Sequence, residues 1–151
     1  MSNFQAENLI QSNYDINIEP MSNSKLVLCL DDSFSYLELH EQYLETFSDK
    51  LSVATAADAQ TALEMLESRD FDCIVSDFEL LKTTGLDFYY QTRETGHELP
   101  FFLLTSRTDL DDRVAETNVR KVFCKNNIPE VYDNLLTAIE QAVEPQNEPT
   151  V

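Results

Sequence analysis

Polar residues whose side chains could take part in chemistry directly follow four apolar runs of this chain. The residues in question are Asp31-Asp32, Asp77, Thr105-Ser106 and Lys125-Asn126. Taken singly, each could serve only in a turn or as a helix cap, because Asp, Asn, Ser and Thr are common in both places. Taken together, they form a charge-balanced set of carboxylates, hydroxyls and one ammonium group.

Carboxylates that lie close together resist joint ionisation unless a positive charge lies among them. Lys125 offers one such charge, and a hard cation such as Mg²⁺, bound through a few oxygens while it keeps some waters, offers another. An ionised carboxylate can attack phosphorus, and cations placed in advance stabilise the charge that develops on the phosphoryl oxygens. The set suits phosphoryl transfer to Asp77, provided that the fold brings these residues together.

Five apolar segments are predicted strands, and each is followed by a helical pattern. The predicted strands are residues 25–30, 51–56, 71–77, 99–106 and 119–125. After the first, Ser33 or Ser35 could cap a helix with an apolar stripe of Tyr36, Leu37, His40, Tyr43, Leu44 and Phe47. After the second, Asp58 could cap a helix that buries Ala59, Ala62, Leu63 and Leu66.

The remaining helical patterns differ in strength. Residues 86–96 form the third, with Gly96 as its C-terminal stop. Residues 107–118 give a weak, polar helix with Leu110, Val114 and Ala115 inward. The last has the clearest spacing, in Tyr132, Leu135, Leu136, Ile139 and Val143.

Repeated strand–helix units with apolar strands predict an α/β fold: a doubly wound, five-stranded parallel sheet with helices on both faces. In such sheets, ligands bind beyond the carboxyl ends of the strands, where the strand order reverses. All four polar positions lie at predicted strand ends. We therefore expect them to converge at one edge of the sheet.

Composition limits the classes of partner. The chain has 28 acidic and 10 basic residues, a net charge of −18, and residues 25–143 alone keep 23 acids against the 10 bases. Such a surface repels phosphate backbones, so direct DNA or RNA binding is not expected. It favours cationic partners or metal ions, although solubility alone would also explain many of the acids.

Cysteine usage and hydropathy indicate a soluble, cytoplasmic protein. Cys29, Cys73 and Cys124 lie in separate apolar runs without metal-ligand spacing, which fits free thiols in a reducing compartment. No leader pattern and no apolar stretch approaching ~18 residues is present, so no membrane insertion is expected. His40 and His97 lack a second ligand at metal-binding spacing, and exposed positions are predicted for both.

Residues 25–143 resemble the receiver domain of two-component response regulators, particularly the stand-alone chemotaxis type. The resemblance rests on "LDDS", "VSDFELLKTTG", "LLTS" and "FCK" in the family's order. Asp31 and Asp77 are 46 positions apart, and Asp77 and Gly85 are 8 apart, which is close to the family's spacing. The resemblance to receiver domains implies a flavodoxin-like strand order of 2-1-3-4-5.

By this resemblance, Asp77 would be the phosphoacceptor, with Mg²⁺ held by Asp31, Asp32, Asp77 and the main-chain carbonyl of Glu79. Thr105 and Lys125 would contact the phosphoryl group. Thr105 could turn toward the new phosphate and move the following loop, so that a local charge becomes a surface change.

The sequence departs from the family pattern around the fifth strand and after Asp77. Asn126 follows Lys125 where the family usually has a proline preceded by a cis bond, so we expect a trans bond or strain there. Val122 stands where many receivers have an aromatic switch, and the neighbouring Phe123 should point to the other face. Leu81 replaces a common proline, which should loosen that loop.

Positions two beyond Asp77 and Thr105 tune phosphate lifetime in the family. In this chain they are Glu79 and Arg107, and Ser106 is a further modulating candidate. One hypothesis is that Glu79 and Arg107 pair across the site and hinder the attacking water. The alternative is two solvated side chains that contribute under about 1 kcal/mol.

Two other classes of function remain open. A degenerate receiver could act as a phosphorylation-independent protein-binding module, but it would be expected to have lost the acid pair, Asp77 or Lys125. An aspartate-nucleophile phosphatase also uses Mg²⁺, with Asp77 and Glu79 as a crude match for its paired acids. That class usually carries its nucleophile on the first strand together with a substrate-capping segment, for which this chain has no room.

The sequence thus predicts a single-domain response regulator with an acidic arm (residues 1–24), a receiver domain (25–143) and a short tail (144–151). A histidine kinase or histidine phosphotransfer protein would phosphorylate Asp77. The signal would leave through the fourth helix, fifth strand and fifth helix to a partner protein that the sequence does not identify. We expect a monomer or weak homodimer, and a signalling domain rather than an enzyme, limited to self-phosphorylation from small donors and autodephosphorylation.

Overall fold

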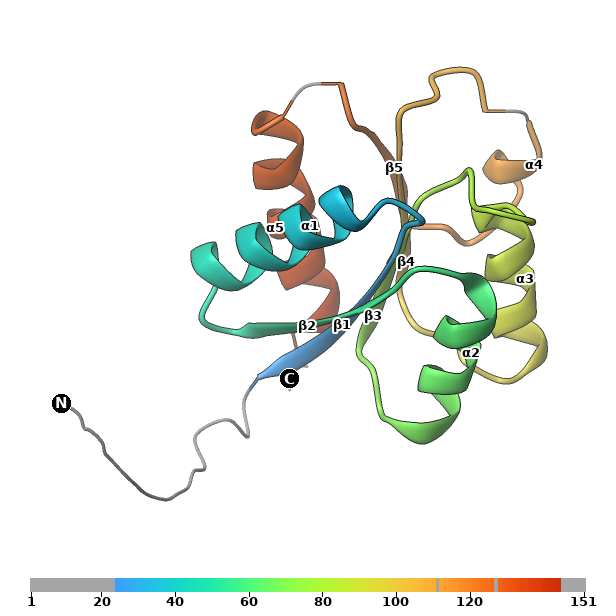
Figure 1. Cartoon of the computed structure of the whole chain (residues 1–151), viewed down its shortest axis with the longest axis horizontal. Coiled ribbons are helices and arrows are strands. Elements are labelled where there is room, and N and C mark those ends of the chain that lie inside the picture. Colours follow the sequence, from blue (N-terminus) through green and yellow to red (C-terminus); the bar gives the residue numbers. More distant parts are fainter. Residues whose placement is uncertain (1–23, 111, 127, 145–151) are drawn as a thin grey trace, which may run out of the picture.

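The computed structural model describes residues 24–110, 112–126 and 128–144, in which strands and helices alternate (Figure 1). The strands are β1 (Lys25–Leu30), β2 (Leu51–Ala56), β3 (Cys73–Ser76), β4 (Phe101–Thr105) and β5 (Lys121–Cys124). The helices are α1 (Phe34–Phe47), α2 (Ala59–Ser68), α3 (Gly85–Glu94), α4 (Asp112–Ala115) and α5 (Glu130–Val143). Apart from Ser24 and Glu144, the predicted arm and tail lie outside the described residues.

The strands form one parallel sheet in the order β2-β1-β3-β4-β5, which confirms the predicted fold class. The register positions the polar residues. Leu30 of β1 lies opposite Ser76 of β3, so Asp31 and Asp77 leave the sheet side by side. Thr105 of β4 lies opposite Cys124 of β5, which brings Lys125 to the same edge.

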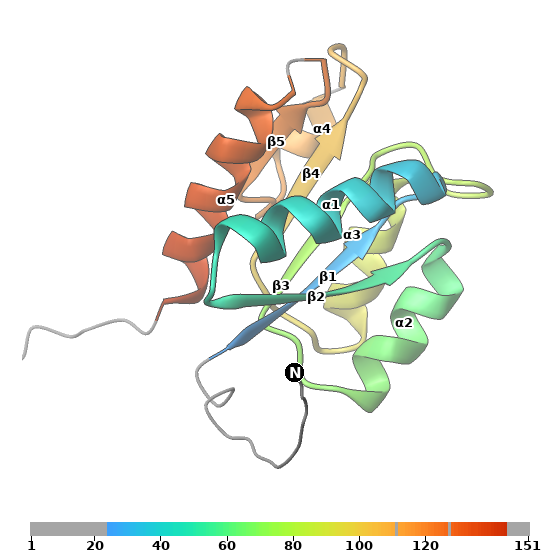
Figure 2. The same cartoon turned by 60° about the vertical axis from the view of Figure 1, so that its left-hand side comes forward.

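Helices cover both faces of the sheet: α1 and α5 lie on one side, and α2, α3 and α4 on the other (Figures 1 and 2). Successive side chains of β1 point to opposite faces of the sheet and belong to two different apolar clusters. Val27 and Cys29 pack with residues of α1 and α5, whereas Leu28 and Leu30 pack with residues of α2 and α3. Burial on both faces is why the strands are apolar throughout rather than alternating.

Side-chain caps fix the starts of three helices near the sheet's carboxyl edge. Of the two serines proposed for α1, Ser33 is the cap, and its hydroxyl accepts from the Tyr36 amide at 3.3 Å. The predicted cap of α2 is confirmed, because Asp58 Oδ1 accepts from the Thr61 amide at 2.8 Å. Thr84 caps α3 in the same way. These bonds satisfy amides that the first helical turn leaves without partners.

The predicted fourth helix over residues 107–118 is wrong in extent, because α4 spans only Asp112–Ala115. Leu110 and Val114 pack against the α2 and α3 cluster as expected, but Ala115 is exposed. A polar segment with few inward side chains buries too little apolar surface to stabilise a longer helix.

The described cysteines are free, as predicted, with Cys29 and Cys73 buried and Cys124 half-buried. Burial raises the pKa values of the Cys29 and Cys73 thiols, so both stay protonated and inert. Within the described residues, no helix has the length and apolar character needed to cross a membrane.

Candidate functional site

Three carboxylates meet at the carboxyl edge of the sheet. Asp31, Asp32 and Asp77 each offer an oxygen, and these atoms all lie within 4.8 Å of one another. Asp31 is buried, Asp77 is half-buried and Asp32 is exposed. The group therefore extends from the protein interior to solvent.

Lys125 enters this group from the end of β5. Its Nζ donates to Asp31 Oδ2 at 2.7 Å and to Asp77 Oδ2 at 3.1 Å. The Lys125 side chain is almost fully buried, and its Nζ lies 3.9 Å from the ring centroid of Tyr36. A buried ammonium needs such partners, since an unpaired charge away from water is costly.

Asp31 and Asp77 have opposite pKa shifts. Burial raises the pKa of Asp31, but hydrogen bonds from His40, Lys125 and the Ser33 amide outweigh it, so its pKa lies below the ordinary value. Burial also raises the pKa of Asp77, and the negative charge of Asp31 adds to this effect. Lys125 offsets it only partly, so the pKa of Asp77 lies above the ordinary value.

The segment that follows β3 is held tightly under Asp77. A Cβ added at Gly85 would lie 2.2 Å from the Asp77 carbonyl oxygen, so only glycine fits there. The Gly85 amide donates to the Phe78 carbonyl, and an isolated bridge joins Glu79 to Thr84. Leu81, expected to loosen this loop, is exposed at its outer side next to Lys82, which has a φ of 102°. The eight-residue spacing from Asp77 to Gly85 is thus a packing requirement.

Thr105 and Ser106, at the end of β4, have different surroundings. Thr105 is buried, and its Oγ1 accepts from the Arg107 amide at 3.1 Å. Ser106 is exposed. Of the two hydroxyls predicted at this strand end, the structure holds that of Thr105 by a specific hydrogen bond.

Glu79 and Arg107 lie within contact distance of each other, as the pairing hypothesis requires. Arg107 Nη1 lies 3.2 Å from Glu79 Oε2, and Arg107 Nε donates to Asp109 Oδ1 at 3.0 Å. The guanidinium also lies over the ring of Phe78. Because Glu79 is 63% exposed, the ion pair itself contributes little to stability.

The prediction that His40 is exposed is wrong. His40 is buried in α1, where its Nδ1 lies 2.6 Å from the Tyr132 hydroxyl and its Nε2 lies 3.5 Å from Asp31 Oδ2. Burial raises the pKa of Tyr132, so its hydroxyl stays protonated, and the His40 tautomer decides which of the two groups donates in this bond. The sequence contained a signal for this, because His40 falls in the same apolar stripe as Leu37 and Leu44. His97 is half-buried beside Glu67.

The end of β5 follows the pattern expected from its sequence. Val122 is exposed and Phe123 is buried against Phe102, so the two side chains point to opposite faces. Among the described peptide bonds, the cis bond is Ile128–Pro129, and the bond from Lys125 to Asn126 is trans. This chain therefore has no aromatic side chain at the position of the family's switch.

The three carboxylates fit a hard divalent cation such as Mg²⁺, which binds oxygen ligands and keeps several waters. Asp31 is buried and held by other groups, while Asp32 is exposed to solvent, so both would be available as oxygen ligands. Glu79, whose carbonyl is the predicted fourth ligand, follows Asp77 by two residues, and its amide lies 3.4 Å from Asp77 Oδ1.

The curated proteins that this chain resembles are matched over only part of their length. The chain is 38% identical to the response regulator MprA of Mycolicibacterium vanbaalenii over 64 residues, which is 42% of this chain and 28% of that protein. It is 27% identical to the hydrogenase transcriptional regulatory protein HoxA of Cupriavidus necator over 120 residues, or 80% of this chain and 24% of that protein. The chain thus matches about a quarter of the length of these relatives.

Two solved structures are matched over nearly their full length and over about three quarters of this chain. The chemotaxis response regulator CheY4 of Vibrio cholerae is 26% identical, with a TM-score of 0.65 over 77% of this chain and 98% of that one. The response regulator TrrA of Thermotoga maritima, solved in complex with Mg²⁺ and BeF, shares the fold at 21% identity and a TM-score of 0.65, over 76% of this chain and 98% of that one.

A family model for the response regulator receiver domain matches residues 27–130, which include the acid pair, Asp77, Thr105 and Lys125. The match spans more than half of the chain, and the strand order agrees with it. Receiver domains are signalling domains of two-component systems rather than turnover enzymes. The chain belongs to the receiver domain family of response regulators.

Proposed function

We propose that this receiver accepts a phosphoryl group on Asp77, in a Mg²⁺-dependent reaction, from a histidine kinase or histidine phosphotransfer protein. The observation that carries the proposal is the position of the Lys125 ammonium, which contacts both Asp77 and Asp31 within a group of three carboxylates. A half-buried Asp77 is accessible to a donor, whereas Asp31 is not.

In the proposed step, an ionised oxygen of Asp77 forms a bond to phosphorus while the bond from phosphorus to the donor's imidazole nitrogen breaks. The bonding electrons leave with the imidazole, and an aspartyl phosphate results. Lys125 stabilises the charge on the phosphoryl oxygens and keeps Asp77 ionised against its raised pKa. The Thr105 hydroxyl would supply a donor, while Asp31, Asp32, Asp77 and the Glu79 carbonyl would hold Mg²⁺. When bound, Mg²⁺ supplies further positive charge at the transferring group.

We further propose that the phosphorylated chain signals by changing a surface that a partner protein recognises. The new phosphate adds charge beside Thr105, the last residue of β4, and Arg107, in the loop before α4. The free thiols of the chain suit a reducing cytoplasm, where we place the reaction. Residues 25–143 as the folding unit and a monomeric or weakly dimeric state are parts of the same proposal.

The test is the intact mass of the protein after incubation with acetyl phosphate or phosphoramidate. We expect one added phosphoryl mass in the presence of Mg²⁺, and none in Asp77→Asn or with a chelator. Ser106→Ala, a neighbouring exposed hydroxyl, is the matched control and should still be labelled. If no adduct forms, beryllofluoride binding detects a site whose adduct is short-lived; failure of both would contradict the proposal and favour a binding module that acts without phosphorylation.

A further inference from the structure

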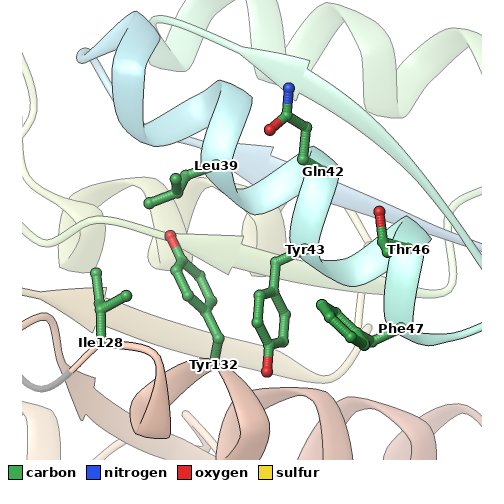
Figure 3. A pocket seen from close by; sticks show the side chains of 7 residues that line it. All are labelled: Leu39, Gln42, Tyr43, Thr46, Phe47, Ile128 and Tyr132. Carbon is green, nitrogen blue, oxygen red and sulfur yellow. The ribbon is translucent and has the colours of Figure 1, made fainter.

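A buried polar pair, His40 and Tyr132, lies beside the acidic site. His40 belongs to α1 and is 2% exposed, and Tyr132 belongs to α5 and is 1% exposed. Figure 3 shows the Tyr132 side chain reaching from α5 toward α1, where its hydroxyl lies 2.6 Å from His40 Nδ1. Both positions fall among the buried apolar residues of their helices, and an apolar side chain would fill either one without burying a polar group. The pair therefore indicates a role beyond packing.

Two aromatic rings fix the orientation of the His40 ring. The ring stacks on Tyr36, with the centroids 6.1 Å apart and an angle of 29° between the planes. Its centroid lies 5.6 Å from that of Tyr132, in an edge-on arrangement. With Nδ1 directed at the Tyr132 hydroxyl, Nε2 faces Asp31 and lies 3.5 Å from Oδ2. The His40 ring cannot turn away from Asp31 without losing these contacts.

The groups around the Asp31 carboxylate leave one of its acceptor positions open. A carboxylate has about four such positions, two at each oxygen. At Oδ2, Lys125 Nζ lies at 2.7 Å and His40 Nε2 at 3.5 Å. At Oδ1, the Ser33 amide donates at 2.9 Å. On the contacts of the described residues, Oδ1 thus keeps one position that can serve a cation.

A proton on His40 Nε2 makes its contact with Asp31 favourable. An unprotonated Nε2 would direct its lone pair at the negative carboxylate and repel it, whereas Nε2–H donates to it. The Tyr132 hydroxyl can then donate to an unprotonated Nδ1. In metal sites, the ligands are commonly held by outer hydrogen bonds of this kind, and loss of one typically weakens metal binding roughly 10–100-fold.

We propose that His40, held by Tyr132, is a positioning residue of the acidic site: it donates from Nε2 to Asp31 Oδ2 and so keeps Oδ1 available to the cation. This role rests on the proposed function, because the cation is the Mg²⁺ of that reaction. The terminal torsion of an aspartate is broad and roughly two-fold, so a carboxylate with fewer partners can turn and exchange its oxygens. Without His40, the Asp31 carboxylate would present the cation with a less fixed ligand.

The test measures the affinity of the full chain for Mg²⁺ by NMR titration, without a phosphodonor. His40→Leu/Tyr132→Phe replaces the pair by apolar groups and should stay folded, as urea denaturation checks, but should bind Mg²⁺ about tenfold more weakly. His40→Gln, whose amide offers both a donor and an acceptor, should restore most of the affinity. Tyr43→Phe is the matched control, since it removes another tyrosine hydroxyl between the same helices, the one that donates to Asp133, and should leave the affinity unchanged.

A second readout needs no cation. In EDTA, proton–nitrogen NMR of the imidazole should show a proton on His40 Nε2, with a resonance that moves in Asp31→Asn. A proton on Nδ1 alone would overturn the positioning role.

Equal Mg²⁺ affinity in the wild type and the apolar double variant would also overturn it. So would a loss of affinity that His40→Gln does not restore or that Tyr43→Phe shares, because either result would point to repacking between α1 and α5. A wild type that binds no Mg²⁺ would contradict the proposed function together with the positioning role. If Mg²⁺ binds but acetyl phosphate does not label Asp77, the proposed function alone fails.

Discussion

Two sides of the sheet's carboxyl edge contact the acidic site in different ways. On the α1–α5 side, side chains connect the site directly to α1 and, through His40, to α5. Asp31 faces His40 of α1, His40 contacts Tyr132 of α5, and Lys125 lies over Tyr36 of α1. These groups are buried or half-buried, and α1 and α5 each run for 14 residues.

On the α4–β5 side the connections are fewer. The Thr105 hydroxyl accepts from the nearby Arg107 amide, α4 has four residues and Val122 is exposed. Conformational coupling between sites depends on well-packed elements that can change between two arrangements. A one-turn helix with exposed neighbours has few packed side chains that could rearrange in this way. The acidic site therefore makes more side-chain contacts toward α1 and α5 than toward α4, while output through α4, β5 and α5 remains a prediction.

The largest expected difference between the two sides is in core packing. Tyr132→Ala should lower the free energy of unfolding by about 3–5 kcal/mol, because it empties a buried aromatic position. Val114→Ala, at a half-buried position of α4, should cost under about 1 kcal/mol. Urea denaturation measures both, and similar losses in the two variants would mean that the two sides support the fold equally.

The pH dependence of stability should separate the two carboxylates, measured in EDTA so that no cation contributes. Asp31 has a lowered pKa in the folded protein, so its ionised form stabilises the fold above the ordinary carboxyl pKa of 3.8, and that stability is lost as the pH falls through the lowered value. Asp31→Asn should therefore cost about 2 kcal/mol near neutral pH and less in acid.

Asp77 should behave in the opposite way. Its raised pKa means that ionisation on folding is unfavourable, so stability is lost as the pH rises from 3.8 through the folded-state value. Asp77→Asn should unfold at higher urea concentration than the wild type at pH 7, with a smaller gain at acidic pH. Matching slopes of stability against pH for the two variants would contradict the assigned environments.

Much of this architecture was predictable, because hydrophobic periodicity and helix-capping residues act within short stretches of sequence. The apolar strands, the Asp58 cap and the convergence of strand ends follow from residues that act within one element or from the general geometry of parallel sheets. The burial of His40 could have been inferred from its place in the apolar stripe of α1, but its polar partner Tyr132 lies 92 positions away, and no local pattern reveals that contact. The fourth helix was overestimated because its end depends on how much surface α4 buries, a tertiary property.

A smaller effect tests the polar connection on the α1–α5 side. Tyr132→Phe keeps the ring and removes the hydroxyl that serves His40 Nδ1, which should cost about 1 kcal/mol. His40→Asn removes the other partner. In a double-mutant cycle measured by urea denaturation, the two changes should cost less together than the sum of their separate effects, since they share one interaction. Strict additivity would show that the two groups act independently.

The smallest expected effect on stability is at the exposed pair of the α4–β5 side. Arg107→Ala and Glu79→Ala should each change the free energy of unfolding by under about 1 kcal/mol, because water and salt screen the Arg107–Glu79 contact. If the pair hinders the attacking water, the aspartyl phosphate should decay a few-fold faster in the double variant, as followed by intact mass over time. Asp109→Ala is the matched control, since it removes the other partner of Arg107 while leaving the contact with Glu79. An unchanged decay rate in the double variant would show that Glu79 and Arg107 are two solvated side chains that do not shield the phosphoryl group from water.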